Sequence, residues 1–482
     1  MCLFVMSCNV NAQNIGLADN YFNDQNFVNA RLEYLRAANM GNVRAYYRLA
    51  DIYLHGLGQN KNEITAILWL SLAAEHDYRE SNKILEKLLS KFNETQLVLI
   101  EKASATFIKS RGKAYIANLY APKIQKTLLP NKISLEKYEG LDIDSSIIDD
   151  NFDDFNEGFD TEFDFDSDLA SDADYLSEQQ DFKESYYLVV EYDIAPDGSV
   201  RNIETIQFLG HGEQKKAVFA LASYDFTPPI FNEQQVFKSQ RAYLGAASFD
   251  NRRFKESHKT VYSQIKRQVA KYKNGKLPMD KYQYAKALMN FPFLPREKGQ
   301  VEKLLKTAID ADIGMAKLEY GLKLYREQTD IKTAIHWITE AAKQGEPEAE
   351  YRLARLNLES PWVKYDENKA MVWFESAIEK QHLHAIRKYA ELLLFAQNAQ
   401  LHDAEQAYKN LITIEAKQEE NPQYYYLLSW AAKLSSKVEY HVAVMHLKQA
   451  IHLAHFYNWP TESWDNLLKK WTSGGSVTIT DT

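Results

Sequence analysis

The chain lacks long hydrophobic runs and contains almost no cysteine. No segment of its 482 residues approaches the roughly 18 consecutive apolar residues that a membrane-spanning helix needs. Its two cysteines, Cys2 and Cys8, both stand at the start of the sequence. These absences argue against an integral membrane protein and against a fold held together by disulfide bonds. With 45% hydrophobic and 26% charged residues, the composition is that of an ordinary globular protein.

Sequence signatures of common catalytic sites are also absent. There is no Gly-x-Ser-x-Gly, no glycine-rich phosphate-binding loop and no His-Glu-x-x-His. Four histidines, His441, His446, His452 and His455, fall on one predicted helix, and the last two lie one turn apart. Two histidines at that spacing can bind a metal, but no third ligand accompanies them, so packing or surface roles are favoured. We therefore predict that the protein is not an enzyme and holds neither a metal nor a cofactor.

The first residues resemble the end of an export signal. Val10 and Ala12 follow an apolar stretch and fit the small-residue rule for cleavage after Ala12. A basic n-region is missing, because the first basic residue is Arg31, which suggests a natural start further upstream. Alternatively, Cys8 is the acylated residue of a weak lipobox, or the segment is an ordinary apolar N-terminus. Residues 1–12 are thus predicted to be a signal-peptide remnant, and the periplasm is the expected location.

Charge is distributed unevenly along the chain. The net charge is -9, but residues 142–181 contain 13 Asp and 3 Glu with no Lys or Arg, so this stretch carries -16 and the remainder carries +7. Because like charges repel and apolar residues are sparse, we predict a disordered linker over 141–183. Residues 164–174 resemble a calcium-binding loop, but Leu169 and Tyr175 stand where glycine and glutamate are required. The mildly basic remainder does not suggest nucleic-acid binding, which needs a clustered basic face.

Small and apolar residues recur at an interval of 36 residues. The first set is Ala30, Ala37, Ala38, Gly41, Ala45 and Leu49, and related sets follow at 66–85, 334–353 and 370–389. Each unit predicts two amphipathic helices, because its apolar residues have helical spacing with charges on the opposite face. Gly41 and Gly345 follow predicted helices, at the position where a left-handed C-terminal cap favours glycine.

This pattern resembles the Sel-one-like repeat, a short relative of the tetratricopeptide repeat. The resemblance covers residues 45–85 and 334–389, with degenerate copies over 301–325 and 402–454. It implies helix pairs that stack into a curved solenoid, whose concave surface binds other proteins. An ordinary helical bundle is the alternative.

Between the repeats, the hydrophobic period changes from that of helices to that of strands. Four apolar side chains of residues 186–194 alternate with more polar neighbours, which predicts a half-buried strand. A turn over 195–199 and a returning strand over 200–208 follow. A helix over 212–223 and a third strand over 239–248 complete a predicted ββαβ unit.

This unit resembles the C-terminal domain of TonB, through residues 191–203 and 224–229. In that family, an extended receptor peptide adds to the third strand by main-chain hydrogen bonds. The resemblance implies a binding edge at Phe237, Ser239, Arg241, Tyr243 and Ala246. The chain departs from the family because it lacks the Tyr-Pro segment before the first strand, a transmembrane helix and a proline-rich spacer. The alternative is a sheet that only joins two repeat arms.

Together these patterns predict a mainly α protein with a small α+β insert, in which two solenoid arms flank a ββαβ TonB-C-terminal-like domain. The predicted domains are 13–140, 184–250 and 251–471, followed by a flexible tail over 472–482. We expect a non-catalytic periplasmic scaffold or adaptor that binds protein partners of the envelope, and no nucleic acid. The alternative is a transport accessory that engages an outer-membrane receptor by β-strand addition.

Overall fold

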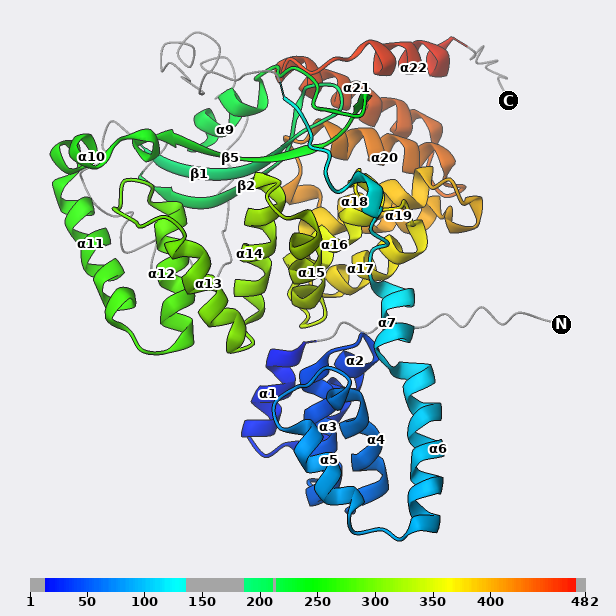
Figure 1. Ribbon diagram of the computed structural model, residues 1–482. Helices are drawn as coiled ribbons and strands as arrows, with labels where there is room; N and C mark the ends of the chain where they lie inside the picture. The colour runs from blue at the N-terminus through cyan, green and yellow to red at the C-terminus, as the bar shows by residue number, and fades with distance from the viewer. Residues whose placement is uncertain (1–13, 136–185, 211–213, 474–482) are drawn as a thin grey trace, which may run out of the picture. The chain divides into compact units, whose positions relative to one another are not determined.

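The computed structural model describes residues 14–135, 186–210 and 214–473, and these residues are mainly helical (Figure 1). A small three-stranded sheet occurs between two sets of helices along the chain. The fold class predicted from the sequence, mainly α with a small α+β insert, is thus confirmed. The predictions for residues 1–12 and 141–183 lie outside the described residues.

The described residues form two compact units. The first takes its residues from Met1–Lys126, Lys317–Tyr325 and Thr329–Tyr389, and the second from Thr127–Ala316, Arg326–Gln328 and Ala390–Thr482. The first unit therefore combines helices from both predicted repeat regions, and the predicted domain boundaries stay predictions. No helix in the described part of the chain is both long and apolar enough to cross a membrane.

The first unit consists of antiparallel helix pairs, as the repeats predict. Its N-terminal helices are α1 (Ile15–Asn23), α2 (Phe27–Asn39), α3 (Val43–His55), α4 (Glu63–Ala74), α5 (Ser81–Leu89), α6 (Glu94–Arg111) and α7 (Lys113–Tyr120). Its later helices are α15 (Ile331–Ala342), α16 (Pro347–Glu359) and α17 (Glu367–Glu379), with parts of α14 (Gly314–Glu327) and α18 (Leu383–Phe395). Tyr34, Leu49 and Leu72 are among the fully buried side chains that fill the core of its N-terminal part.

Hydrogen bonds between distant parts of the sequence hold this unit together. The side-chain amide of Asn42 donates to the main-chain oxygen of Lys343 (2.8 Å). The indole Nε1–H of Trp373 donates to the main-chain oxygen of Tyr120 (3.0 Å). The Trp373 side chain is fully buried, so α17 closes over the end of α7.

Asparagine caps explain where several of these helices begin. The capping residues Asn14, Asn26, Asn42, Asn62 and Asn93 each accept a hydrogen bond from a main-chain N–H of the first turn. Each cap satisfies a donor that the helix itself leaves unpaired. Gly41 and Gly345 have φ angles of +86° and +84°, which confirms the predicted left-handed helix ends.

The second unit contains the antiparallel sheet. β1 (Tyr187–Ile194) is the central strand, between β2 (Val200–Leu209) and β5 (Lys238–Gly245). The helix α9 (Gln214–Ala222) follows β2, and a small hairpin of β3 (Ile230–Phe231) and β4 (Gln234–Gln235) precedes β5. The predicted ββαβ order is thus present. The prediction that the third strand continues to residue 248 was wrong, because Gly245 adopts φ 58° and the 3-10 helix η5 (Ala246–Ser248) follows.

Helices make up the rest of the second unit. They are α10 (Asn251–Ser257), α11 (Lys259–Asn274), α12 (Pro278–Asn290), α13 (Gln300–Asp310), α19 (Ala404–Ile412), α20 (Pro422–Leu434), α21 (Tyr440–Phe456) and α22 (Glu462–Thr472). The last helix packs its buried Trp471 against Leu447 and Ile451 of α21. It therefore closes the hydrophobic core at this end of the helical region.

Both faces of the sheet are covered by helices, so the prediction of a half-buried strand was wrong for β1. All eight of its residues are buried. On one face, Leu188 packs in a cluster with Leu221 of α9. On the other face, the hydroxyl of Tyr187 donates to the main-chain oxygen of Asn290 (2.5 Å), and its ring meets Phe254 of α10 edge-on. In Figure 1 the sheet accordingly lies between α9 and the helices that follow β5.

Candidate functional site

The predicted binding edge coincides with an outer strand of the sheet. In the described part of the chain, β5 is the last strand in the order β2-β1-β5. Ser239, Arg241 and Tyr243 belong to this strand, whereas Phe237 precedes it and Ala246 follows it. The structure thus places three of the five predicted residues on the edge strand and two beside it.

The register shows which main-chain groups of β5 point away from β1. The N–H of Ala246 donates to the oxygen of Tyr186 (2.8 Å), and the strands pair without a register shift. Hydrogen-bonded and non-hydrogen-bonded pairs alternate along an antiparallel ladder. The N–H and C=O groups of Ser239, Arg241 and Tyr243 therefore lie on the outer side of β5, which is the side that strand addition would use.

The side chains of these three residues have other roles, which the sequence did not reveal. The hydroxyl of Ser239 donates to Asp193 (2.6 Å), and that of Tyr243 donates to the main-chain oxygen of Met289 in α12 (2.9 Å). Arg241 donates to Glu191 through Nε (3.1 Å) and Nη2 (2.5 Å). Only the main chain of this edge, and not these side chains, is therefore directed towards an added strand.

A buried ion-pair cluster links the sheet to α14. The Oε1 atom of Glu191 accepts from Arg241 and also from Nη1 of Arg326 (2.6 Å). The exposed fractions of these side chains are 7% for Glu191, 8% for Arg241 and 12% for Arg326. Charge-assisted hydrogen bonds of this geometry are strong because water screens them little. The cluster therefore ties β1 and β5 to Arg326, which belongs to the same unit as the sheet.

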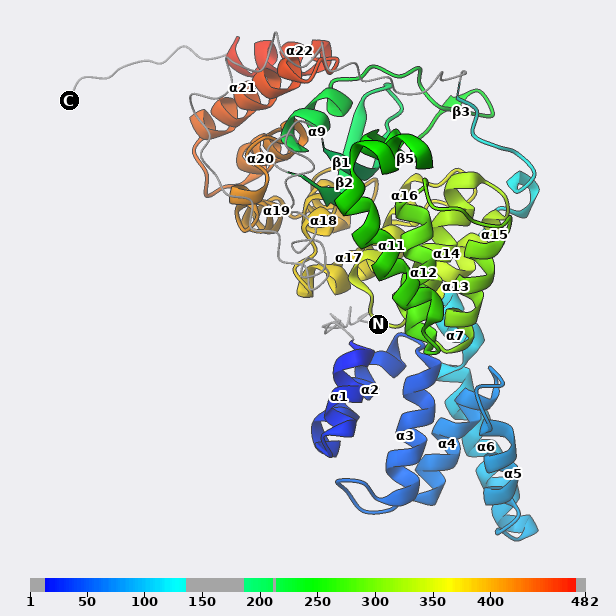
Figure 2. The ribbon, with the colours of Figure 1, turned by 90° about the vertical axis from the view of Figure 1, so that its left-hand side faces the viewer.

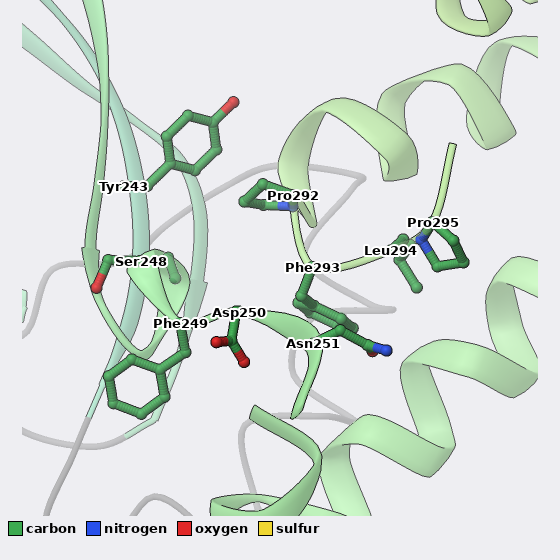
Figure 3. Close-up of a pocket in the computed structure, with 10 residues that line it drawn as sticks. Tyr243, Ser248, Phe249, Asp250, Asn251, Pro292, Phe293, Leu294 and Pro295 are labelled. Carbon is green, nitrogen blue, oxygen red and sulfur yellow. The ribbon is translucent and has the colours of Figure 1, made fainter. Parts of the chain in front are cut away.

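A pocket of about 580 Å³ lies at the C-terminal end of β5. Figure 3 shows Tyr243 and Phe249 on one side and residues 292–295 on the other, with Asp250 between them. The polar groups near it already stabilise the fold: Asp250 accepts from the main-chain N–H of Arg253 at the start of α10 (2.8 Å). Seven of the ten residues that line the pocket are apolar or aromatic, so the pocket suits an apolar side chain.

A second group of charged and aromatic residues lies in the first unit, on α16 and at the start of α18. Tyr351 is only 1% exposed, and the ring of His382 stacks on it with centroids 4.8 Å apart. Glu348 accepts a hydrogen bond from Arg352, and one of its oxygens lies 2.8 Å from Nε2 of His382. Burial alone would raise the pKa of Glu348, but Arg352 and His382 outweigh it and hold that pKa below its usual range.

A second buried ion pair, formed by Glu350 and Lys380, connects α16 to the end of α17. Glu350 is fully buried and accepts from Ser376 (2.8 Å) and from Lys380 (2.5 Å). Burial lowers the pKa of Lys380, and Glu350 partly opposes this effect. The i,i+4 spacing of Glu348 and Arg352 was the only sequence signal for this network. Its other contacts join residues about 30 positions apart and could not be found from the sequence.

The histidines of α21 do not converge on a common point. His446 is buried, and burial lowers its pKa. His441 lies 3.0 Å from Glu439, and His455 lies 4.0 Å from Asp465. Among the described residues, no group of three or more potential ligands could hold a metal ion.

Sequence comparison assigns the helix pairs of the first unit. The Sel1 repeat family matches residues 43–78, 309–346 and 347–382. The chain carries Sel1 repeats. The three matches contain the helix pairs α3 and α4, α14 and α15, and α16 and α17. The match at 309–346 overlaps the degenerate copy predicted over 301–325 as well as the predicted region 334–389, and none of the three matches falls on the copy predicted over 402–454.

Solved structures with Sel1 repeats show weak overall similarity to this chain. A Sel1 repeat protein from Oxalobacter formigenes is 20% identical with a TM-score of 0.30, over 43% of this chain and 58% of that one. A protective antigen of uropathogenic Escherichia coli with an SLR fold is 12% identical with a TM-score of 0.32, over 94% of this chain and 75% of that one. The chain thus spans little more than half of the Oxalobacter protein. No curated protein matches it.

Proposed function

We propose that this chain is a non-catalytic scaffold of the periplasm that holds protein partners on the surfaces of its Sel1 repeats. Three matched repeats support this proposal, because proteins with such repeats generally mediate interactions between proteins. The periplasmic location rests on Val10 and Ala12, and fractionation of cells that produce the whole chain tests it. Recovery of the protein with cytoplasmic markers would contradict this part of the proposal.

The strongest support for the proposal comes from the exposed apolar side chains of α6 in the first unit. Ile100 is the one buried residue of the 18-residue helix α6, and Val98 and Leu99 are each 65% exposed. Exposed apolar side chains on a helix that packs little of its own surface can contribute to a continuous apolar patch, and such patches bind other proteins. We therefore assign the exposed face of α6 as one contact surface of the scaffold.

A second candidate function uses the sheet edge. The outer main-chain groups of Ser239, Arg241 and Tyr243 support β-strand addition by an extended peptide. The TonB-like resemblance would make that peptide part of an outer-membrane receptor. In this alternative, the chain is a transport accessory, and the pocket beside Tyr243 receives an apolar side chain of the added strand.

Affinity capture from a detergent-solubilised envelope distinguishes the two functions. The baits are the wild-type protein, Val98→Asp combined with Leu99→Asp, and Tyr243→Pro. Tyr243→Pro removes the main-chain N–H that points away from β1 and keeps the hydrogen bonds between β5 and β1. Tyr243→Phe is its matched control, because it removes only the side-chain hydroxyl. Each bait is first checked for an unchanged melting temperature.

Partners that are lost only with the α6 variant support the scaffold. Outer-membrane receptors that are lost with Tyr243→Pro, but kept with Tyr243→Phe, support the transport accessory instead. If every partner is retained by all variants, neither surface is the binding site.

A further inference from the structure

The outer side of α11 carries a concentrated positive charge. Five residues of this helix are basic and exposed, and its 16 residues include no Asp or Glu. A sixth exposed cation follows in the turn to α12. The basic surface consists of Lys259, Lys266, Arg267, Lys271, Lys273 and Lys276. Figure 1 draws α11 at the left-hand border of the ribbon, and Figure 2 turns that side towards the viewer.

Helical geometry separates this charge from the side that packs on the protein. Val261, Ile265 and Val269 are buried at four-residue spacing and define the inner side of α11. Lys259, Lys266 and Lys273 follow at seven-residue spacing, which places them in one row along a flank of the exposed side, and Arg267 and Lys271 lie towards the opposite flank. The row is about 21 Å long at 1.5 Å per residue. The exposed side of α11 therefore presents a row of three lysines with two further cations beside it, and not an isolated charge.

Exposed apolar side chains adjoin the end of this row. Leu277 is 67% exposed and Met279 is 40% exposed, in the turn between α11 and the first residues of α12. This turn is held in place, because the N–H of Leu277 donates to Asp280 (2.9 Å) and Lys281 donates to the main-chain oxygen of Gly275 (2.6 Å). The protein thus holds two apolar side chains outward, next to Lys273 and Lys276.

We propose that the basic surface and the Leu277–Met279 turn bind the surface of an anionic phospholipid membrane. The cations would lie at the lipid headgroups, and Leu277 and Met279 would enter the boundary with the acyl chains. A nucleic acid would match the charge of the row but would offer no apolar phase for these two side chains. The inner apolar stripe of α11 is used within the protein, so the helix contacts the membrane only through its polar side.

Vesicle sedimentation with the full chain tests this proposal. The probes are phosphatidylcholine vesicles with and without about one third phosphatidylglycerol. The test variant combines Lys266→Gln, Lys271→Gln and Lys273→Gln. The matched control combines Lys83→Gln, Lys102→Gln and Lys109→Gln, which are exposed lysines of α5 and α6, and changes the total charge by the same amount.

We expect the wild-type protein to bind the anionic vesicles and not the neutral ones. Each cation near such a surface contributes about a fivefold change in partitioning, so the test variant should bind about a hundredfold more weakly. The control variant should bind as the wild type does. A further variant, Leu277→Gln, should lose the part of the binding that persists at high salt.

Three results would overturn the proposal. One is equal binding of the wild type to both kinds of vesicle, or to neither. Another is an equal loss in the test and control variants, which would indicate a response to total charge. The third is retention on immobilised polyglutamate that depends on the three lysines while anionic vesicles are not bound, since the surface would then recognise an acidic protein.

Discussion

The Glu191 cluster should control the stability of the second unit, and Glu191→Gln is the sharpest perturbation of it. Glutamine has nearly the same shape, so the substitution removes the negative charge without opening a cavity. Arg241 and Arg326 then lose the carboxylate that both bond in the native protein. Their side chains are only 8% and 12% exposed, so water replaces that interaction poorly.

The expected loss is large for a single substitution. Removing one partner of a buried ion pair lowers the free energy of unfolding by about 3–5 kcal/mol, because a buried charge loses its compensation. Arg326→Met should lower it by roughly 1–2 kcal/mol, because the carboxylate keeps its two hydrogen bonds from Arg241. Glu256→Gln is the matched control, since its ion pair with Arg252 is mostly exposed, and it should not differ measurably from the wild type.

Urea unfolding followed by far-ultraviolet circular dichroism provides the measurement. With an m-value of about 2–3 kcal/mol/M, Glu191→Gln should shift the midpoint of the second unit down by roughly 1–2 M. The variants should rank in the order Glu191→Gln, Arg326→Met, Glu256→Gln. If Glu191→Gln is as stable as Glu256→Gln, the cluster is solvated in the protein and the reasoning fails.

Three further predictions concern other parts of the structure. Gly41→Ala should lower the free energy of unfolding by about 2–3 kcal/mol, because φ is +86° and the new Cβ would lie 2.4 Å from Cγ2 of Ile116. Its control is Gly299→Ala, which has open space around the new Cβ and should lower the free energy of unfolding by only about 1 kcal/mol. Burial lowers the pKa of His76 to about 4, so as the pH falls the unfolded chain binds a proton at this residue before the folded protein does. The melting temperature of the first unit should therefore fall between pH 6.5 and pH 4, and it should fall less in His76→Gln. A wild-type slope in that variant would contradict the assignment. Trp459→Phe should lower stability by about 1–2 kcal/mol, because it removes the indole donor to the main chain at the end of α9, and an unchanged urea midpoint would show that the bond contributes nothing.

The helical part of the fold was predictable because its signals are local. The recurrence of small residues every 36 positions reports helix pairs whose close packing tolerates only small side chains, as at Ala37 and Ala73, which are both fully buried. The asparagine caps and Gly41 act within one helix turn. The strands were likewise visible from alternation and from the turn at 195–199.

Contacts that join distant residues could not be predicted in this way. Glu191 and Asp193 suggested a solvent-facing side of β1, yet both are buried because partners from β5 and α14 bond them. Arg326 lies 135 positions after Glu191, and nothing in the local sequence indicates that pair. The predicted edge at Ser239, Arg241 and Tyr243 followed from a family resemblance, and strand addition there stays a prediction.

The assembly of the first unit from separated stretches of sequence has a consequence for synthesis of the protein. Asn42 and Tyr120 bond to Lys343 and Trp373, so the N-terminal helices cannot complete their unit until the chain has been made through about residue 389. About 260 residues separate Lys126 from Tyr389, and ribosomes add roughly 5–20 residues per second. When the chain emerges at the rate of its synthesis, the earliest helices therefore wait for roughly 15–50 seconds with their docking surfaces uncovered. During that interval they depend on chaperones, or on their own local stability, to avoid association with neighbouring chains.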